Sequence, residues 1–191
     1  MTEKNLPSPW DLQNDDLHAD CRIFEVRQRR FKRKSDGLEG DFYVLDTNDW
    51  VNVLAITPEQ KIVLVRQFRF GSRENSLEPP GGVVEKGEDP IIAGLRELEE
   101  ETGYVGENPE LLGSVRPNAA ILSNRCHVVL VREATKRAQL NFDQHEELVT
   151  ELYPIAEIKD LVKSGEITHS IGLNSIFLLL LELEKGLFHQ E

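Results

Sequence analysis

The sequence predicts an α/β (α+β) fold in one domain, and three observations support this. A chain of 191 residues that is 39% hydrophobic and 29% charged is long enough for one substantial core and short for two ordinary domains. Residues 62–65 are apolar at every position, as expected of a strand that is covered on both faces. Residues 89–103 combine the start and stop signals of a helix.

The N-terminal quarter of the chain is expected to be mostly extended. Residues 1–20 are polar and are expected to form an arm or a short helix with little core. Two β-rich runs within residues 21–46 flank Ser35-Asp36-Gly37, a turn signal that predicts a hairpin. Further strands are expected over residues 50–57 and 61–70.

The middle of the chain contains a loop and then a helix. Residues 78–82 read Glu-Pro-Pro-Gly-Gly and are expected to form a rigid loop, because prolines lack amide donors and glycines permit positive φ. The helix begins with Asp89 as N-cap and Pro90 in the first turn, and Gly103 is a suitable left-handed C-cap.

The C-terminal part alternates between strands and helices. Strands are expected over residues 126–131 and 148–153, a polar loop over 139–147, a short helix over 155–163, and a longer helix over 171–185.

Composition excludes several functional classes. The formal net charge of −12 argues against broad binding to nucleic acid or to anionic membranes, for which a basic surface is needed. The longest apolar run, Ile176–Leu181, is far shorter than the roughly 20 residues that span a bilayer, and the polar N-terminus does not show the basic-then-apolar pattern expected of a signal sequence. With only Cys21 and Cys126, both expected to be reduced, the chain is predicted to be a soluble cytoplasmic protein.

Four carboxylates crowd the last turn of the predicted helix. Glu97, Glu99, Glu100 and Glu101 lie where the helix dipole already disfavours negative charge. Such a conflict with folding often marks a functional site. Since Glu97, Glu100 and Glu101 share one stripe of the helix, they are expected to face one spot that could hold Mg²⁺. The alternative is a solvated acidic face.

The spacing of residues around this cluster is more specific. Gly82, Glu88 and the run Arg-Glu-Leu-Glu-Glu-Glu-Thr-Gly-Tyr over residues 96–104 resemble the Nudix box, Gly-x5-Glu-x7-Arg-Glu-U-x-Glu-Glu-x-Gly-U, where U is bulky and apolar. Upstream, residues 65–69 and 77–82 are similar to the branch of ADP-ribose and nucleoside-diphosphate-sugar pyrophosphatases.

This resemblance implies an α/β/α sandwich with a mixed central sheet and an additional N-terminal antiparallel sheet. It implies a single Nudix domain, in which residues 1–55 form the N-terminal arm and hairpin region and residues 56–191 the core. The implied activity is Mg²⁺-dependent hydrolysis of the diphosphate linkage of ADP-ribose or nucleoside-diphosphate sugars to a nucleoside monophosphate and a sugar phosphate, with Mn²⁺ as an alternative cation. A homodimer is implied, with no nucleic-acid or membrane partner.

The resemblance also assigns roles within the box. Glu97 and Glu101 would be the principal Mg²⁺ ligands, the carbonyl of Gly81 a further ligand, and Glu100 an additional ligand or the general base. Arg96 would orient the glutamates through its i,i+4 relation to Glu100.

A general base must also reach the attacking water. Related enzymes often use a glutamate from a loop near the end of the sheet, which here corresponds to Glu147 or, second, Glu146, and the one that is not the base could bind a metal. The loop could equally be an ordinary acidic loop, and Glu100 is the rival base.

Substrate contacts are implied outside the box. Arg69 and Arg66 match the arginine that contacts the diphosphate, although strand-end arginines commonly form surface ion pairs. Phe42, Tyr43 and Phe31 lie in the hairpin from which related enzymes present aromatic rings to the base, although core packing is an alternative role.

Two other features receive no catalytic assignment. Six of the eight residues over 27–34 are basic, and they could approach phosphates, contact a second subunit or, by default, solvate an edge hairpin. The five histidines show no metal-binding spacing and are given no chemistry: His18, His127, His145, His169 and His189.

Three other functions stay open beside this hypothesis. The first is a Nudix enzyme for nucleoside triphosphates, coenzyme A or dinucleoside polyphosphates. The second is a non-catalytic module that binds ADP-ribose, which the complete set of box glutamates disfavours. The third is RNA processing, which the overall acidity disfavours.

Overall fold

The computed structural model describes residues 6–141 and 147–188. The chain divides into two units: residues 1–47 with 118–124, and residues 48–117 with 125–191. The strand that begins at Trp50 lies wholly in the second unit, because it pairs only with strands of that unit. The boundary of residues 1–55 expected from the sequence would cut through this strand.

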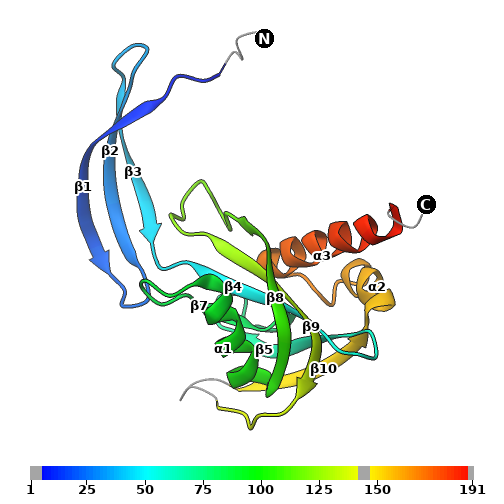
Figure 1. Cartoon of the computed structure of the whole chain (residues 1–191). Coiled ribbons are helices and arrows are strands. Elements are labelled where there is room, and N and C mark those ends of the chain that lie inside the picture. The colour runs from blue at the N-terminus through cyan, green and yellow to red at the C-terminus, as the bar shows by residue number, and fades with distance from the viewer. Residues whose placement is uncertain (1–5, 142–146, 189–191) are drawn as a thin grey trace. The chain divides into compact units, whose positions relative to one another are not determined.

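The first unit is a three-stranded antiparallel sheet in the order β1-β2-β3 (Figure 1), formed by β1 (Trp10–Asp20), β2 (Glu25–Arg33) and β3 (Glu39–Asp46). The predicted hairpin is confirmed, with Gly37 at φ +74° in its turn. The expectation of an arm or short helix over residues 1–20 is wrong for Trp10–Asp20, which forms a full strand. The backbone of β1 forms its hydrogen bonds with β2, and the polar side chains of β1 do not by themselves predict this pairing.

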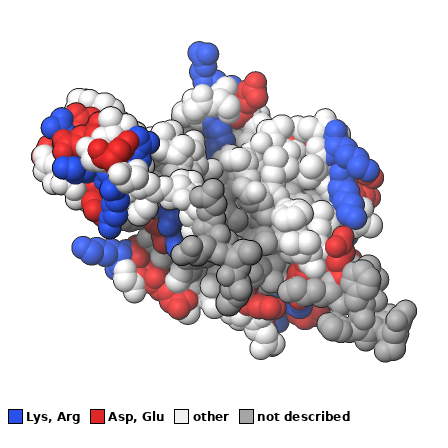
Figure 2. Space-filling model, turned by 90° about the horizontal axis from the view of Figure 1, so that it is seen from above, with Lys and Arg blue, Asp and Glu red and all other residues white. Residues whose placement is uncertain are grey.

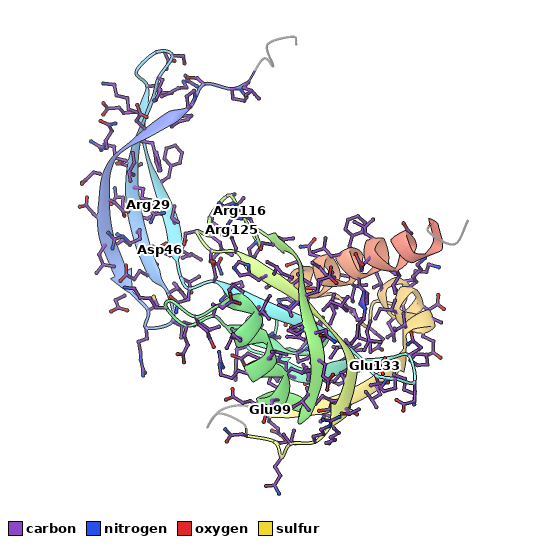
Figure 3. All side chains as sticks on the ribbon, viewed as in Figure 1. Arg29, Asp46, Glu99, Arg116, Arg125 and Glu133 are labelled. Atoms are coloured by element: carbon purple, nitrogen blue, oxygen red, sulfur yellow. The ribbon has the colours of Figure 1, made fainter. Side chains whose placement is uncertain are left out.

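The basic run over residues 27–34 is neutralised within this sheet. Each of its six basic side chains lies within 4 Å of a carboxylate: Arg27 with Asp15 and Glu25, Arg29 with Asp15 and Asp46, Arg30 with Asp41, Lys32 with Glu39, Arg33 with Asp36, and Lys34 with Asp11. Figure 2 shows basic and acidic atoms interspersed over this unit, and Figure 3 shows Arg29 and Asp46 on neighbouring strands. The default expectation of an edge hairpin is wrong, because β2 is the central strand.

The second unit contains a seven-stranded mixed sheet with the main order β10-β5-β4-β9-β8, where β6 pairs with β5 and β7 with β4. The pairing of β4 with β9 is parallel and the other pairings are antiparallel. The strands are β4 (Trp50–Ile56), β5 (Lys61–Arg69), β6 (Glu74–Glu78), β7 (Gly81–Val83), β8 (Tyr104–Val115), β9 (Cys126–Lys136) and β10 (Leu148–Pro154).

Helices cover both faces of this sheet (Figure 1). One face is covered by α1 (Pro90–Thr102). The other face is covered by α2 (Ile158–Lys163), which follows the 3₁₀ turn η1 (Ile155–Glu157), and by α3 (Ser170–Phe188). Alternate side chains of β4 enter two cores, since successive strand residues point to opposite faces. Val53 packs in the core beneath α1, whereas Leu54 packs in the core beneath α2 and α3. The expected α/β/α sandwich is confirmed.

The segment between β6 and α1 differs from the rigid loop expected over residues 78–82. Gly81 and Gly82 form part of the short strand β7, which pairs with Val51 and Asn52 of β4. A Cβ atom at Gly81 would lie 2.0 Å from the carbonyl oxygen of Val51, so only glycine allows this approach. The two prolines, which have no amide hydrogen to donate, lie between the strands.

Two further expectations concern the environment of the chain. Among the described residues, no helix combines the length and apolar character that crossing a membrane requires. Cys21 is exposed and Cys126 is buried, and both are free thiols. Burial raises the pKa of Cys126 to about 12, which keeps this thiol protonated and unreactive.

Candidate active site

Helix α1 is positioned by the signals that predicted it. The Asp89 side chain accepts a hydrogen bond from the amide of Ile91, and Gly103 adopts φ +70° and donates its amide to the carbonyl of Glu99. Gly94 lies in the middle of the helix, where a Cβ would come within 3.2 Å of methyl groups of Val51 and Val53. This glycine therefore lets the helix approach the sheet closely.

Arg96 is the centre of the polar network on α1. Its Nε and Nη2 lie 3.1 and 3.2 Å from the carboxylate oxygens of Glu88, and its Nη1 lies 2.8 Å from Glu97 and 3.2 Å from Glu100. Nη2 also donates to the carbonyl of Val83. The Arg96 hydrogen bonds lower the pKa of Glu88, and Glu88 in turn raises the pKa of Arg96. The box arginine thus holds three carboxylates and the preceding loop in one arrangement.

Two glycines bring the main chain against the glutamates. The amide of Gly81 donates to Oε2 of Glu101 over 2.9 Å, and Glu101 is almost completely buried. A Cβ atom at Gly82 would lie 2.4 Å from Oε1 of Glu97, so the carboxylate occupies the space that a larger residue would need. The glycines of the Glu-Pro-Pro-Gly-Gly segment therefore belong to the site.

The three glutamates expected to face one spot make contacts of two kinds. Arg96 bridges Glu97 and Glu100, while Glu101 turns to the amide of Gly81. Within residues 6–141 and 147–188, no three His, Cys, Asp or Glu side chains are grouped closely enough to hold a metal ion as they stand. The available donors, carboxylates and the Gly81 carbonyl, are nevertheless the hard oxygen ligands that suit Mg²⁺ or Mn²⁺. Glu99 is exposed at the end of the helix (Figure 3) and takes no part in the network.

A second polar cluster joins the ends of β5 and β6 to the residue that precedes α3. The Arg69 guanidinium forms two hydrogen bonds with Glu78, of 2.9 and 2.7 Å, and Nδ1 of His169 lies 2.7 Å from Oε2 of the same carboxylate. The Glu78 side chain is only 3% exposed. Burial alone would raise the pKa of Glu78, but the contacts with Arg69 and His169 outweigh it and lower the pKa to about 2.

Two cavities adjoin this cluster, and Arg69 and His169 line both of them. The smaller, of about 280 Å³, is bounded by Gly81 and Gly82. The larger, of about 970 Å³, includes Glu147 in its lining. The predicted diphosphate contact Arg69 and the predicted base Glu147 thus share one cavity. Glu146, the second choice of base and a possible metal ligand, lies outside the described residues.

The other predicted substrate contacts are not among the described residues that line these two cavities. Arg66 pairs with Glu151 over 2.6 Å and with Glu166 over 3.3 Å, and neither cavity includes it. Its alternative role as an ion-pairing arginine therefore fits the structure better. Phe42 and Tyr43 belong to the first unit, where both are about half exposed.

These two rings make local aromatic contacts within the first unit. Phe42 makes edge-to-face contacts with Trp10 and Phe31, and Tyr43 makes one with His18. Both rings remain about half exposed, so neither is fully buried in a core.

Glu78 and His169 were not identified as site residues from the sequence. Glu78 belongs to the segment that carried the family resemblance, but its spacing alone does not predict a buried carboxylate. His169 precedes α3 and has no motif partner nearby in the chain. Only the packing of α3 against the sheet brings it to Glu78.

Comparisons with known proteins agree with this fold. The sequence matches the NUDIX domain over residues 47–170. The methanol dehydrogenase activator of Bacillus methanolicus is 36% identical over 143 residues, covering 73% of this chain and 75% of that protein. The ADP-ribose pyrophosphatase of Bacillus subtilis (strain 168) is 34% identical over 120 residues, covering 61% of this chain and 64% of that protein.

A crystal structure of an ADP compounds hydrolase superposes with a TM-score of 0.84 at 21% identity, over 95% of this chain and 97% of that chain. At that identity the superposition demonstrates the common fold. Together with the domain match and the complete box, it confirms the resemblance noted in the sequence. This chain belongs to the Nudix family.

Proposed function

We propose that this chain hydrolyses the diphosphate linkage of ADP-ribose or related nucleoside-diphosphate sugars to a nucleoside monophosphate and a sugar phosphate. The observation that carries the proposal is the carboxylate network around Arg96, complete at every position of the Nudix box and adjoining the cavity at Gly81 and Gly82. The names of two similar proteins, an ADP-ribose pyrophosphatase and an ADP compounds hydrolase, support this substrate class.

The metal would be held by oxygen ligands of the box. Glu97 and Glu101 would be the principal ligands of Mg²⁺ or Mn²⁺, with Glu100 and the carbonyl of Gly81 as further ligands. When bound, such an ion neutralises charge on the diphosphate oxygens and lowers the pKa of a coordinated water. Arg96 holds Glu97 and Glu100 in place through its Nη1.

Substrate positioning would fall to Arg69. Its guanidinium is oriented by two hydrogen bonds from Nε and Nη2 to the buried Glu78, and its side chain is 42% exposed toward the cavities. A guanidinium fixed in this way is suited to contact phosphate oxygens, because its planar donors match their geometry. Hydrolysis then requires attack of water on one phosphorus and cleavage of its bond to the bridging oxygen.

Glu147 is the proposed general base. Its side chain is exposed and lines the larger cavity together with Arg69, so its carboxylate could accept a proton from water beside the bound diphosphate. Glu100 is the rival base, but its carboxylate already accepts a hydrogen bond from Arg96.

A substrate panel tests the function. The purified chain is incubated with Mg²⁺ or Mn²⁺ and with ADP-ribose, an ADP-hexose, ATP, coenzyme A or a dinucleoside polyphosphate, and the products are separated by chromatography. The proposal predicts the highest kcat/KM for an ADP-sugar, with AMP and a sugar phosphate released. Preferred release of pyrophosphate from ATP, or binding of ADP-ribose with no cleavage, would reject it.

Three finer statements complete the proposal. We infer a homodimer, a cytoplasmic location, and stacking of the substrate base on Phe42 or Tyr43. The half-exposed rings and the two free thiols, Cys21 and Cys126, are compatible with these inferences. Light scattering of the purified chain tests the dimer, and a Phe42→Ala variant with unaltered KM for ADP-ribose would exclude that ring.

A further inference from the structure

His169 occupies a particular place between the two cavities of the second unit. Its Nδ1 is buried and lies 2.7 Å from Oε2 of Glu78, a close contact whose angles differ from those of a regular hydrogen bond, whereas its side chain as a whole is 31% exposed. The exposed part of the side chain therefore lies away from Nδ1, on the remainder of the ring, which includes the edge that carries Nε2. Since His169 lines both cavities, the exposed part of its ring is within reach of a ligand there.

The contact with Glu78 determines which nitrogen carries the proton. The Glu78 carboxylate, paired with Arg69, can only accept hydrogen bonds, and a lone pair on Nδ1 at 2.7 Å would be repelled by it. Nδ1 of His169 therefore carries a proton, and in the neutral ring the lone pair lies on Nε2. The exposed edge is thus a hydrogen-bond acceptor, held in a fixed orientation by a buried partner.

The lining of the larger cavity favours a neutral ligand that is rich in hydroxyl groups. Among its described residues, the charged side chains are Arg69, Glu74 and Glu147, so apart from Arg69 the lining offers a phosphate only carboxylates. Its neutral polar side chains can exchange hydrogen bonds with hydroxyl groups: Gln67, Ser72, Asn75, Ser76, Thr168 and Ser170.

We propose that the sugar arm of the substrate occupies the larger cavity and that one of its hydroxyl groups donates a hydrogen bond to Nε2 of His169. The diphosphate then lies beside Arg69, toward the smaller cavity at Gly81 and Gly82. His169 is in this way a specificity residue that selects a sugar over an arm without hydroxyl groups. The proposal rests on the proposed hydrolysis of nucleoside-diphosphate sugars.

The test compares two substrates that share the adenosine and the diphosphate: ADP-ribose and the ethyl ester of ADP, which has no sugar hydroxyls on its second arm. The ratio of their kcat/KM values is measured for the unaltered chain and for His169→Asn. Asparagine retains a donor at the position of Nδ1, and so the contact with Glu78, but it lacks the Nε2 edge. The ratio does not depend on the fraction of folded enzyme.

The expected result is a fall of about fivefold in the ratio for His169→Asn, the effect of losing one neutral hydrogen bond. The matched control is His127→Asn, because His127 contacts Ser114 and Asp49 and lies outside both cavities. It is expected to leave the ratio unaltered. An unaltered ratio in His169→Asn, including an equal loss on both substrates, would overturn the proposal. If the unaltered chain cleaves neither substrate, it is the proposed function that fails.

Discussion

Replacing Glu78 by glutamine should destabilise the second unit in a pH-dependent way. Glutamine keeps the shape of the side chain but removes the negative charge of Glu78, which both Arg69 and His169 contact. The carboxyl is almost fully buried, so water cannot replace its contribution, and the guanidinium and imidazole lose their common partner.

The magnitude follows from the pKa of Glu78. Its pKa is lowered from 4.5 to about 2, because its contacts with Arg69 and His169 outweigh the effect of burial. At 1.36 kcal/mol per pKa unit, the ionised carboxylate contributes about 3 kcal/mol to the free energy of unfolding at pH 7. Since the pKa in the folded state is lowered, this contribution is fully present above pH 4.5 and is lost as the pH falls toward 2. At pH 3 the contribution of Glu78 to the free energy of unfolding should be less than about half of its contribution at pH 7.

Urea denaturation at pH 7 and at pH 3 measures this effect. The difference in unfolding free energy between the unaltered chain and Glu78→Gln is expected to be about 3 kcal/mol at pH 7 and to shrink clearly at pH 3. Glu74→Gln serves as a control, because Glu74 is an exposed glutamate of the same strand. The reasoning is refuted if Glu78→Gln is as stable as the unaltered chain at pH 7, or if the difference is the same at both pH values.

Three substitutions test the box and the base. Gly82→Ala should displace the Glu97 carboxylate, lowering kcat and costing about 1–3 kcal/mol of stability in urea denaturation. Gly113→Ala, whose methyl group would lie at an ordinary contact distance of 3.5 Å from Cδ1 of Leu178, should have neither effect. Glu101→Gln should remove most activity in steady-state assays and leave the melting temperature near that of the unaltered chain, since the amide oxygen can still accept from the Gly81 amide; normal turnover would contradict its role. Glu147→Gln should lower kcat by about 10²–10⁴-fold with little change in Mg²⁺ affinity by calorimetry, and an unaltered kcat would exclude it as base.

The elements that depend on local signals could be predicted from the sequence. Helix α1 begins and ends as expected because Asp89 and Gly103 act on their nearest neighbours in the chain. The box was recognisable for the same reason, since one helix and the loop before it carry all its residues. Strand β1 could not be predicted from its own polar residues. They are accommodated by contacts with another strand, where Asp15 forms ion pairs with Arg27 and Arg29.

The parts of the site that depend on tertiary contact were only partly predictable. Helical spacing indicated that Glu97, Glu100 and Glu101 share a stripe, but not that Arg96 bridges two of them while the third turns to a backbone amide. The contact between His169 and Glu78 joins residues that are far apart in the chain. No periodicity or local motif reports such a contact.

The most direct test of the central claim is hydrolysis of ADP-ribose in ¹⁸O-labelled water with Mg²⁺, analysed by mass spectrometry. The account predicts AMP and ribose phosphate in equal amounts with one labelled oxygen per turnover, and almost no product after chelation or with Glu97→Gln. Intact ADP-ribose with the unaltered chain, or equal turnover by Glu97→Gln, would contradict it.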